Sequence, residues 1–350
     1  MAEALIEVDD LSVTFRSEHG RLLRAVDGVS LRVAEGEVLG LVGESGCGKT
    51  TVARVMAGQL QPASGTVRFD GRDLSRKRRR EDRRAIQMVF QDPYSSLNPR
   101  MTVRSVLAEL LRIHGLVPRA GVEQRCREVM ALVGLPPNAL DSLPSQFSGG
   151  QRQRIAIARA LVVEPRVIIA DEPVSALDVS VQTTILRLFE ELRSRLGLTI
   201  VFISHNLAVV RHLSNRVAVM YLGRVVEEGD REPVFRDPRH PYTRALLASA
   251  PRLHQTTLVR PSVRGEPPSP IDVPSGCSFH PRCPRAEPLC SRDSPRLEWV
   301  GAAAGHLAAC HFRLEAPGND ADRSPANQGN ERDQDREGLA GSAVPPRPDQ

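Results

Sequence analysis

Long apolar runs are missing from this sequence. No uninterrupted stretch approaches the roughly 18–20 apolar residues that a membrane-spanning helix requires. The opening residues, MAEALIEVDD, are acidic, whereas a secretory signal begins basic and continues apolar. We therefore expect a chain that stays in the cytoplasm and does not itself cross a bilayer.

Cysteine, net charge and internal repetition are also limited. Six cysteines in 350 residues are too few for a disulfide-rich scaffold, and the formal net charge is only +5. The apolar share of 41% and the charged share of 25% lie near the globular averages of about 45–50% and about 25%, which excludes wholesale disorder. Because the sequence has no internal repeat, we expect one copy of each folded unit.

Short apolar runs alternate with helical patterns up to about residue 228. This alternation predicts an α/β domain with several strands buried on both faces. The expected strands span residues 37–42, 86–90, 167–170, 198–203 and 217–221. The expected helices span residues 49–57, 103–113, 122–133, 150–161 and 179–196.

The composition changes after residue 250. Residues 251–274 are rich in Pro, Ser and Arg, which predicts an extended linker. A cysteine-containing module follows, and residues 315–350 then hold no aromatic residue but five Pro, eight acidic and four basic residues. We expect that tail to be disordered. The predicted units are a main domain (1–235), a C-terminal extension (236–313) and the tail (314–350).

A glycine-rich motif lies between a predicted strand and a predicted helix. It fits the pattern G-x-x-x-x-G-K-[ST] and consists of Gly43, Glu44, Ser45, Gly46, Cys47, Gly48, Lys49 and Thr50. In such a P-loop, backbone N–H groups and the helix N-terminus point at the β- and γ-phosphates, and the lysine adds a positive charge. The threonine hydroxyl binds Mg²⁺. A glycine-rich structural turn is the alternative, but the placement favours a nucleotide site that includes Thr51.

Two further motifs suit the same chemistry. The apolar run 167–170 ends in Asp171 and Glu172, which predicts a Mg²⁺ ligand and a general base for water attack. The run FSGGQ places Ser148, Gly149, Gly150 and Gln151 before an apolar helix, which predicts a second anion-binding nest. The sequence therefore predicts two phosphate-binding sites in one chain.

Together these motifs resemble those of the ATP-binding-cassette ATPases, with Phe147 where the family's signature usually has Leu. The resemblance implies an α/β fold: a P-loop NTPase (RecA-like) core, an antiparallel β subdomain and an inserted helical subdomain at about 93–160. In that family two such domains pair head to tail. The resemblance therefore implies that residues 148–151 contact the ATP bound to a partner subunit.

Three other positions match the family in the expected order. The resemblance implies that Gln91 senses Mg²⁺ and the attacking water, that Asp178 lies at the dimer interface, and that His205 contacts the γ-phosphate. Taken singly, these residues could be a turn residue, a helix cap and a core histidine. The family also stacks adenine on an aromatic residue near the position of Phe15, but Phe15 also alternates with apolar residues as part of a strand face.

Two longer segments narrow the resemblance. VFQDPYSSLNPRMTV (89–103) and HPYTRALLASAP (240–251) resemble the ATPase subunits of oligopeptide, dipeptide and nickel importers, nearer to the second of their two ATPase types. The resemblance implies ATP hydrolysis that energises peptide import at the cytoplasmic face of the inner membrane. The implied partners are a second ATPase subunit forming a heterodimer, two permeases and an extracytoplasmic substrate-binding protein. The alternative cargo is nickel or another solute.

Four cysteines lie in the C-terminal module: Cys277, Cys283, Cys290 and Cys310. In a cytosolic chain such a group holds a metal more often than disulfides, but its spacing lacks C-x₂-C and decides neither for zinc nor for an iron–sulfur cluster. The family resemblance favours a [4Fe–4S] cluster, with zinc or no metal as alternatives. His280, His306 and His311 are possible substitute ligands, and Cys47 and Cys126 are expected to be structural.

A dense basic run covers residues 76–84, and nucleic acid or anionic lipid could bind it. No aromatic residue interleaves with it for base stacking, so a self-paired surface segment is the favoured interpretation. Cassette ATPases that act on DNA ends insert long coiled coils, and those that act on ribosomes usually fuse two cassettes. The sequence shows neither feature, so no nucleic-acid partner is expected.

Overall fold

The computed structural model describes residues 4–16, 20–74, 78–92, 97–249, 265–300 and 305–313. The chain divides into two units, residues 1–315 and 316–350, and all described residues belong to the first. The predicted tail therefore lies outside the described residues, as do most of the predicted linker and residues 76 and 77 of the basic run. The predicted division between a main domain and an extension at residue 235 stays a prediction.

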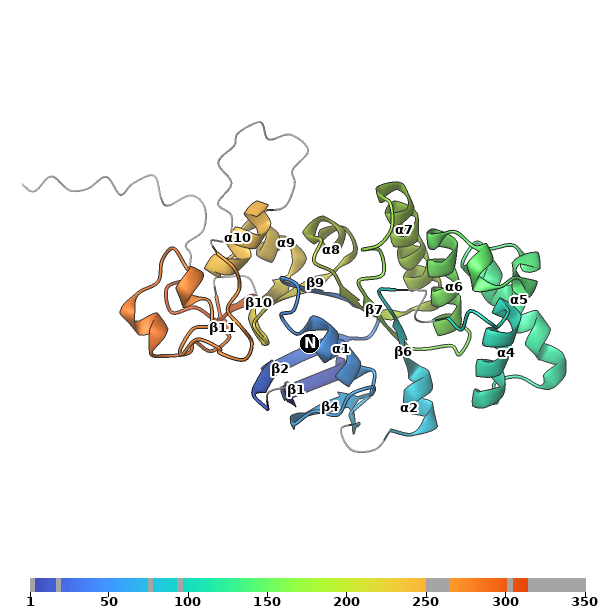
Figure 1. The fold of residues 1–350 in the computed structure, drawn as a ribbon, viewed down its shortest axis with the longest axis horizontal. Coiled ribbons are helices and arrows are strands. Elements are labelled where there is room, and N and C mark those ends of the chain that lie inside the picture. The colour runs from blue at the N-terminus through green and yellow to red at the C-terminus, as the bar shows by residue number, and fades with distance from the viewer. Residues whose placement is uncertain are drawn as a thin grey trace, which may run out of the picture. The chain divides into compact units, whose positions relative to one another are not determined.

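The larger sheet forms the centre of the described chain (Figure 1). Its strand order is β11 (Glu298–Trp299), β12 (Leu307–Ala308), β10 (Arg224–Asp230), β9 (Arg216–Tyr221), β3 (Val38–Val42), β8 (Thr199–Ile203), β7 (Val167–Asp171) and β6 (Ile86–Val89). The strands from β9 to β6 run parallel, and β10, β12 and β11 continue the sheet antiparallel. The carboxyl ends of β3, β6, β7 and β8 therefore meet at one edge, where open α/β sheets bind ligands.

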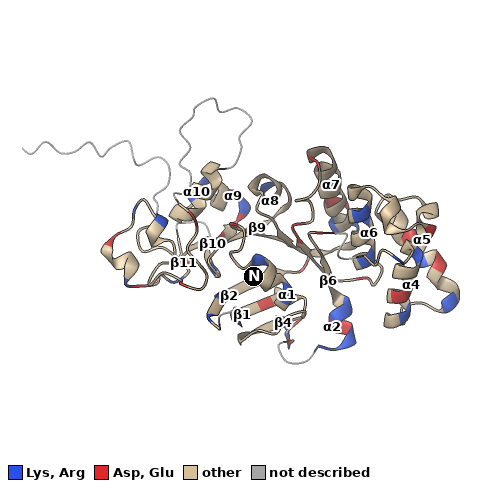
Figure 2. Ribbon diagram, in the orientation of Figure 1, with Lys and Arg blue, Asp and Glu red and all other residues tan. Residues whose placement is uncertain are grey.

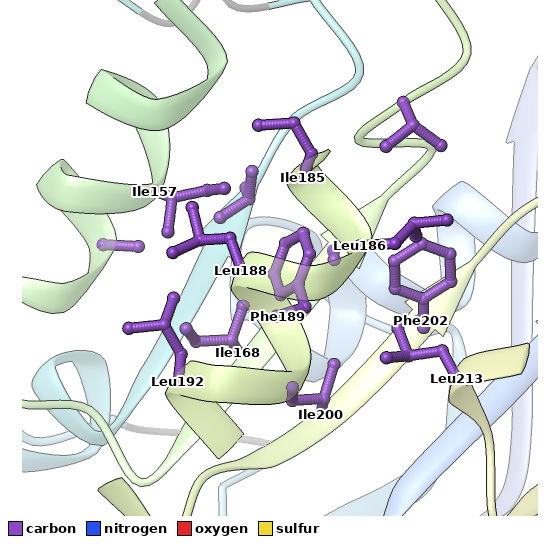
Figure 3. Close-up of a cluster of buried hydrophobic side chains, with 14 of the residues drawn as sticks. Ile157, Ile168, Ile185, Leu186, Leu188, Phe189, Leu192, Ile200, Phe202 and Leu213 are labelled. Carbon is purple, nitrogen blue, oxygen red and sulfur yellow. The ribbon is translucent and has the colours of Figure 1, made fainter. Parts of the chain in front are cut away.

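The central strands separate two hydrophobic cores. Successive side chains of a strand point to opposite faces, so Val38 and Val42 of β3 join one core while Leu39 and Leu41 join the other. Every residue of β3, β7 and β8 is buried, as the continuous apolar runs predict. In the first core, Phe189 lies edge to face against Phe202 with ring centroids 5.8 Å apart (Figure 3).

A second, antiparallel sheet has the order β2 (Leu22–Ala34), β1 (Ala4–Arg16), β4 (Ser64–Phe69) and β5 (Arg72–Asp73). The apolar face of this sheet packs into the second core, where Ile6 and Val29 are fully buried. The sheet is the antiparallel β subdomain that the family resemblance implies.

Helices cover both faces of the larger sheet. They are α1 (Lys49–Met56), α2 (Arg80–Ala85), α4 (Val103–His114), α5 (Val122–Leu132), α6 (Gly149–Leu161), α7 (Val179–Leu196), α8 (Leu207–Leu213), α9 (Arg231–Arg236) and α10 (Pro241–Ser249). Figure 1 shows α4, α5 and α6 grouped at the β6 end of the sheet. These helices form the inserted helical subdomain. They pack together through the buried side chains of Leu107, Leu111, Val129 and Met130. None of the helices in the described part of the chain is long and apolar enough to span a bilayer.

The cysteine segment is continuous with the larger sheet. Strand β12 pairs with β10 through Glu227 and Glu228, and β11 pairs with β12. Glu227 is fully buried, and its carboxylate accepts the backbone N–H groups of Arg239 and His240 at 2.7 and 2.9 Å. The same carboxylate lies 2.7 Å from Nε2 of His306. A buried carboxylate needs such partners, so Glu227 joins two parts of the extension to the sheet.

Candidate nucleotide site

The predicted P-loop connects β3 to α1. Glycine occupies the positions where neighbouring backbone lies too close for a side chain. A Cβ on Gly43 would lie 2.3 Å from the carbonyl oxygen of Met220, and one on Gly48 would lie 2.3 Å from that of Ala25. Gly48 also has a φ of 106°, which side chains rarely tolerate. Because Gly48 has no side chain to cap α1, the first N–H groups of this helix stay available to an anion.

Lys49 lies across the loop. Its ammonium donates to the carbonyl oxygens of Gly43 and Glu44, at 2.9 Å each, and lies 3.7 Å from Sγ of Cys47. Lys49 is 5% exposed, so these contacts satisfy a buried charge. Burial raises the pKa of the Cys47 thiol although Lys49 opposes it, which keeps the thiol protonated and little reactive.

Thr50 and Asp171 meet beside the loop. The Thr50 hydroxyl donates to Oδ1 of Asp171 at 3.0 Å, which joins the start of α1 to the end of β7. Burial raises the pKa of Asp171, and the negative charge of Glu172 adds to this effect, while the hydrogen bond from Thr50 opposes it. A hydroxyl beside a carboxylate presents the oxygen ligands that Mg²⁺ prefers. The pair would hold Mg²⁺ as the sequence predicts.

Glu172 and His205 follow the neighbouring strands β7 and β8. Nδ1 of His205 lies 3.1 Å from Oε2 of Glu172. Glu172 has a φ of 47°, and its N–H donates to the carbonyl oxygen of Ile203 at 3.0 Å. Such left-handed backbone is uncommon outside glycine and is found at active sites, where surrounding contacts hold it. The glutamate side chain is 15% exposed and the histidine 56%, so His205 is not a core histidine.

Gln91, Asp178 and Phe15 are the other site residues that the sequence predicts. Gln91 is exposed just after β6, at the same edge of the sheet as Asp171. Asp178 takes the N-cap position of α7, but its side chain accepts no capping hydrogen bond from the described residues. Phe15 is 41% exposed on β1, so it does not belong to the core. The catalytic, interface and adenine-binding roles of these residues stay predictions.

The second predicted cradle begins α6. Ser148 is the N-cap, its hydroxyl accepts the N–H of Gln151, and the Gln151 side chain accepts the N–H of Ser148 at 3.0 Å. A Cβ on Gly150 would lie 2.5 Å from Val181, so glycine is needed where α6 meets α7. This capping box fixes the helix N-terminus that an anion would approach.

Sequence reasoning missed two residues that touch the P-loop. The N–H of Glu44 donates to the Tyr242 hydroxyl at 2.9 Å, and the Glu44 carboxylate accepts two hydrogen bonds from Arg282. Tyr242 lies within the segment HPYTRALLASAP that carries the family resemblance, which was the only signal for it. Arg282 is 238 positions from Glu44, and no local pattern indicates their contact.

The four C-terminal cysteines line one cavity, together with His280 and His311. All four are free thiols. Burial and the neighbouring thiols raise the pKa of Cys310 to about 11, and burial also raises the pKa of Cys277 and Cys283. Among the described residues, no three Cys, His, Asp or Glu side chains converge on a point that could hold one metal ion. The structure therefore does not confirm the predicted iron–sulfur cluster or the zinc alternative.

The basic run makes contacts within its own unit. Arg78 donates to the carbonyl oxygens of Val55 and Met56 at 2.7 Å each, and burial lowers its pKa to about 10. Asp82 is 1% exposed and pairs with Arg72. Figure 2 shows both signs of charge on α2. These contacts favour the self-paired surface segment over a nucleic-acid surface.

Two family models match the chain. Residues 26–175 match the model described as "ABC transporter". Residues 226–290 match the model described as "Oligopeptide/dipeptide transporter, C-terminal region". The second match includes Tyr242, Arg282 and three of the four clustered cysteines.

Similar proteins cover most of the chain. The oligopeptide transport ATP-binding protein AppF of Bacillus subtilis is 46% identical over 323 residues, which are 89% of this chain and 98% of AppF. The oligopeptide transport ATP-binding protein OppF of Salmonella typhimurium is 48% identical over 324 residues, 88% of this chain and 96% of OppF.

Solved structures of ABC transporter cassettes are similar as well. CbiO1 from Clostridium perfringens, part of the ABC transporter complex CbiONQ, aligns with a TM-score of 0.59 and 30% identity over 67% of this chain and 92% of its own. The bacterial ABC transporter cassette MJ0796, solved as a dimer, aligns with a TM-score of 0.58 and 28% identity over 65% of this chain and 98% of its own.

Proposed function

Because the chain belongs to the ATP-binding subunits of ABC transporters, in their oligopeptide and dipeptide branch, we propose that it hydrolyses ATP to energise peptide import. One observation carries the proposal. The Thr50–Asp171 hydrogen bond and the Glu172–His205 contact lie together at the carboxyl ends of β7 and β8, beside a P-loop. This is the arrangement that phosphoryl transfer to water requires.

Each residue has a separate task in this scheme. Lys49 exchanges its loop carbonyls for phosphate oxygens, and the α1 N-terminus binds the same phosphates through its N–H groups. Thr50 and Asp171 hold Mg²⁺, which neutralises charge on the β- and γ-phosphates when bound. Glu172 takes a proton from the attacking water as general base. His205 orients the Glu172 carboxylate and would contact the γ-phosphate, and Gln91, at the same edge of the sheet, would contact the water.

A second subunit completes the site in this proposal. Ser148, Gly149, Gly150 and Gln151 contact ATP bound to the partner, and Asp178 lies at the shared interface. The dimeric structure of the similar MJ0796 cassette supports this arrangement. The partner we propose is a second, different ATPase subunit, which makes the pair a heterodimer.

The proposed complex includes membrane proteins. Oligopeptide importers of this family join their ATPase subunits to permeases and an external substrate-binding protein, so we place the chain peripherally on the cytoplasmic side of the membrane. Two permease subunits would accompany the two ATPase subunits. The C-terminal match at residues 226–290 supports peptides as the cargo over nickel or another solute.

We propose that the four C-terminal cysteines hold a [4Fe–4S] cluster rather than a zinc ion, as the family resemblance favours. Zinc needs four donors about 2.3 Å from a single point, and the four thiols do not converge in that way. A cluster takes one thiolate at each iron, so its ligands surround a cavity, and Cys277, Cys283, Cys290 and Cys310 all line one. Because three of these thiols have a raised pKa, binding must release their protons.

Reconstitution of the whole complex in lipid vesicles tests the proposed function. External peptide with its binding protein should stimulate ATP hydrolysis, and labelled peptide should accumulate only when ATP is supplied. Uptake of Ni²⁺ in place of peptide would contradict the proposed cargo. Stimulation of the isolated chain by DNA or ribosomes, without any effect of permeases, would contradict the transport function.

A further inference from the structure

Glu44, the second residue of the P-loop, is held at two points by the C-terminal extension. Its N–H donates to the Tyr242 hydroxyl at 2.9 Å. Its two carboxylate oxygens accept hydrogen bonds from the two terminal nitrogens of Arg282, at 2.8 and 3.0 Å. Such a two-bond pair between guanidinium and carboxylate fixes direction as well as distance. The extension thus controls both the backbone and the side chain of one loop residue.

The surroundings of Arg282 make this contact hard to break. The arginine side chain is 6% exposed and the glutamate 26%. Arg282 also donates to the Tyr221 hydroxyl at 3.2 Å and to the carbonyl oxygen of Gly265 at 3.0 Å. Burial alone lowers the pKa of Arg282, but its bonds to Glu44 and Tyr221 outweigh burial and raise it. Loss of the Glu44 carboxylate would leave the buried positive charge of Arg282 without this negative charge beside it, which is strongly unfavourable.

An aromatic cluster fixes both contacts in place. Tyr221, Tyr242 and Phe279 pack with ring centroids 4.7, 5.3 and 5.4 Å apart. They come from β9, α10 and the segment before Arg282, so three parts of the chain meet at this point. Tyr242 and Phe279 are almost fully buried. Because buried aromatic rings in such contacts have little freedom, the Tyr242 hydroxyl has a defined position.

The cluster connects the cysteine segment to the loop. Arg282 directly precedes Cys283, and the N–H of Cys277 donates to the carbonyl oxygen of Cys290 at 2.8 Å. At the other end, the carbonyl oxygen of Glu44 accepts a hydrogen bond from the Lys49 ammonium. The chain of contacts therefore runs from the cysteine segment through Arg282 and Glu44 to Lys49, the residue expected to bind phosphate.

We propose that Tyr242 and Arg282 are positioning residues that hold the P-loop open for nucleotide, so that the C-terminal extension sets the affinity for ATP. The inference rests on the proposed function, because it requires this loop to bind ATP. Neither residue touches the reacting atoms, so both should change ATP binding while leaving turnover at saturation unchanged.

The test compares three variants of the full chain in its assembled complex. Tyr242→Phe removes the hydroxyl that binds Glu44 and keeps the ring. Arg282→Lys keeps the charge and loses the two-bond geometry. The matched control is Ser249→Ala, which removes an exposed hydroxyl of the same helix as Tyr242, one that donates to the carbonyl oxygen of Ala245. Mg²⁺–ATP binding is measured by calorimetry, KM and kcat by phosphate release, and folding by thermal unfolding.

We expect the KM and Kd for ATP to rise roughly three- to tenfold in Tyr242→Phe and Arg282→Lys, with kcat within about twofold of wild type. Ser249→Ala should change the Kd less than about twofold. An unchanged Kd in both folded test variants would overturn the inference, as would an equal rise in the control. Failure of wild type to bind ATP would instead overturn the proposed function. If Arg282→Lys does not fold, Tyr242→Phe decides alone.

Discussion

Nδ1 of His205 lies 3.1 Å from Oε2 of Glu172, although the two residues follow different strands. The contact exists because β7 and β8 are parallel neighbours and their carboxyl ends coincide in register at Asp171 and Ile203. A base needs a fixed direction as much as a suitable pKa, and the exposed imidazole restrains the glutamate. Each residue should therefore affect the other's role in hydrolysis.

Replacement of Glu172 by Gln should separate binding from turnover. The amide keeps the shape of the side chain but cannot accept a proton, so we expect unchanged ATP binding and steady-state hydrolysis at least about 100-fold slower. Phosphate release by the assembled complex measures the rate. The matched control is Glu190→Gln, because Glu190 pairs with His212 on the surface at 3.3 Å. Equal rates in both variants would refute the assignment.

Replacement of His205 by Ala should slow hydrolysis about 100-fold with a small change in the Kd for ATP, because the imidazole acts on the γ-phosphate and on the glutamate. In the double variant with Glu172→Gln, the loss in hydrolysis rate should be smaller than the product of the two single losses, because the residues act as one unit. Single-turnover kinetics of both single variants and the double variant measure this. Fully multiplicative losses would show that the two residues act separately.

Replacement of Thr50 by Val should weaken Mg²⁺ binding. Valine has nearly the same shape but no hydroxyl, so it removes one expected ligand and the hydrogen bond to Asp171. We expect the Mg²⁺ concentration for half-maximal hydrolysis to rise at least about tenfold. Thr183→Val is the control, because that exposed hydroxyl donates to the carbonyl oxygen of Val179 in its own helix. A Mg²⁺ dependence equal to wild type would contradict the predicted ligand.

Acid should destabilise the protein through His240. This residue is almost fully buried, its Nδ1 accepts the N–H of Tyr242, and burial lowers its pKa from 6.5 to about 4 although Glu227 opposes the shift. As the pH falls from about 6.5 to about 4, the unfolded chain takes up a proton here that the folded chain does not, so stability is lost.

His240→Asn cannot titrate, so its thermal midpoint should fall less than that of wild type across this pH range. His212→Asn, at an exposed position, is the control and should follow wild type. Parallel curves for His240→Asn and wild type would rule out this source of acid sensitivity.

The proposed [4Fe–4S] cluster should be lost when one of its four cysteines is replaced. After anaerobic purification, wild type should contain iron and sulfide in equal amounts, and Cys290→Ser should lose most of both, because the proposed cluster uses all four thiolates as ligands. Cys126→Ser, a buried cysteine on α5 away from the cavity, should keep them. Zinc without iron in wild type would support the alternative metal, and an active protein free of any metal would contradict both.

Much of the nucleotide site could be predicted from the sequence, because its residues lie in short local motifs at strand ends. The P-loop, Asp171, Glu172 and His205 each follow an apolar run, and a parallel sheet brings such ends together. Helix α7 was predicted with the bounds that the structure has, Val179–Leu196. The strand bounds differ by a single residue at one end, for example 86–90 against Ile86–Val89.

Other features could not be predicted because they depend on distant parts of the chain. The Glu44–Arg282 pair joins positions 238 apart, and neither residue stands in a pattern that indicates the other. Strand β2, absent from the predicted strands, has charged residues among its apolar ones and register shifts against β1, which obscure its alternation. Strands β11 and β12 are two residues long, and only pairing with β10 makes them strands.

These short strands have a consequence for solubility. Without β12, the long strand β10 would present an unpaired edge, and such edges recruit other chains into aggregates. The outermost strand β11 is only two residues long, which offers little length for a foreign strand to pair with. Because β12 pairs with β10 at Glu227 and Glu228, we expect the extension to protect this part of the edge from other chains. A chain truncated before residue 298 should aggregate even where its nucleotide site is complete.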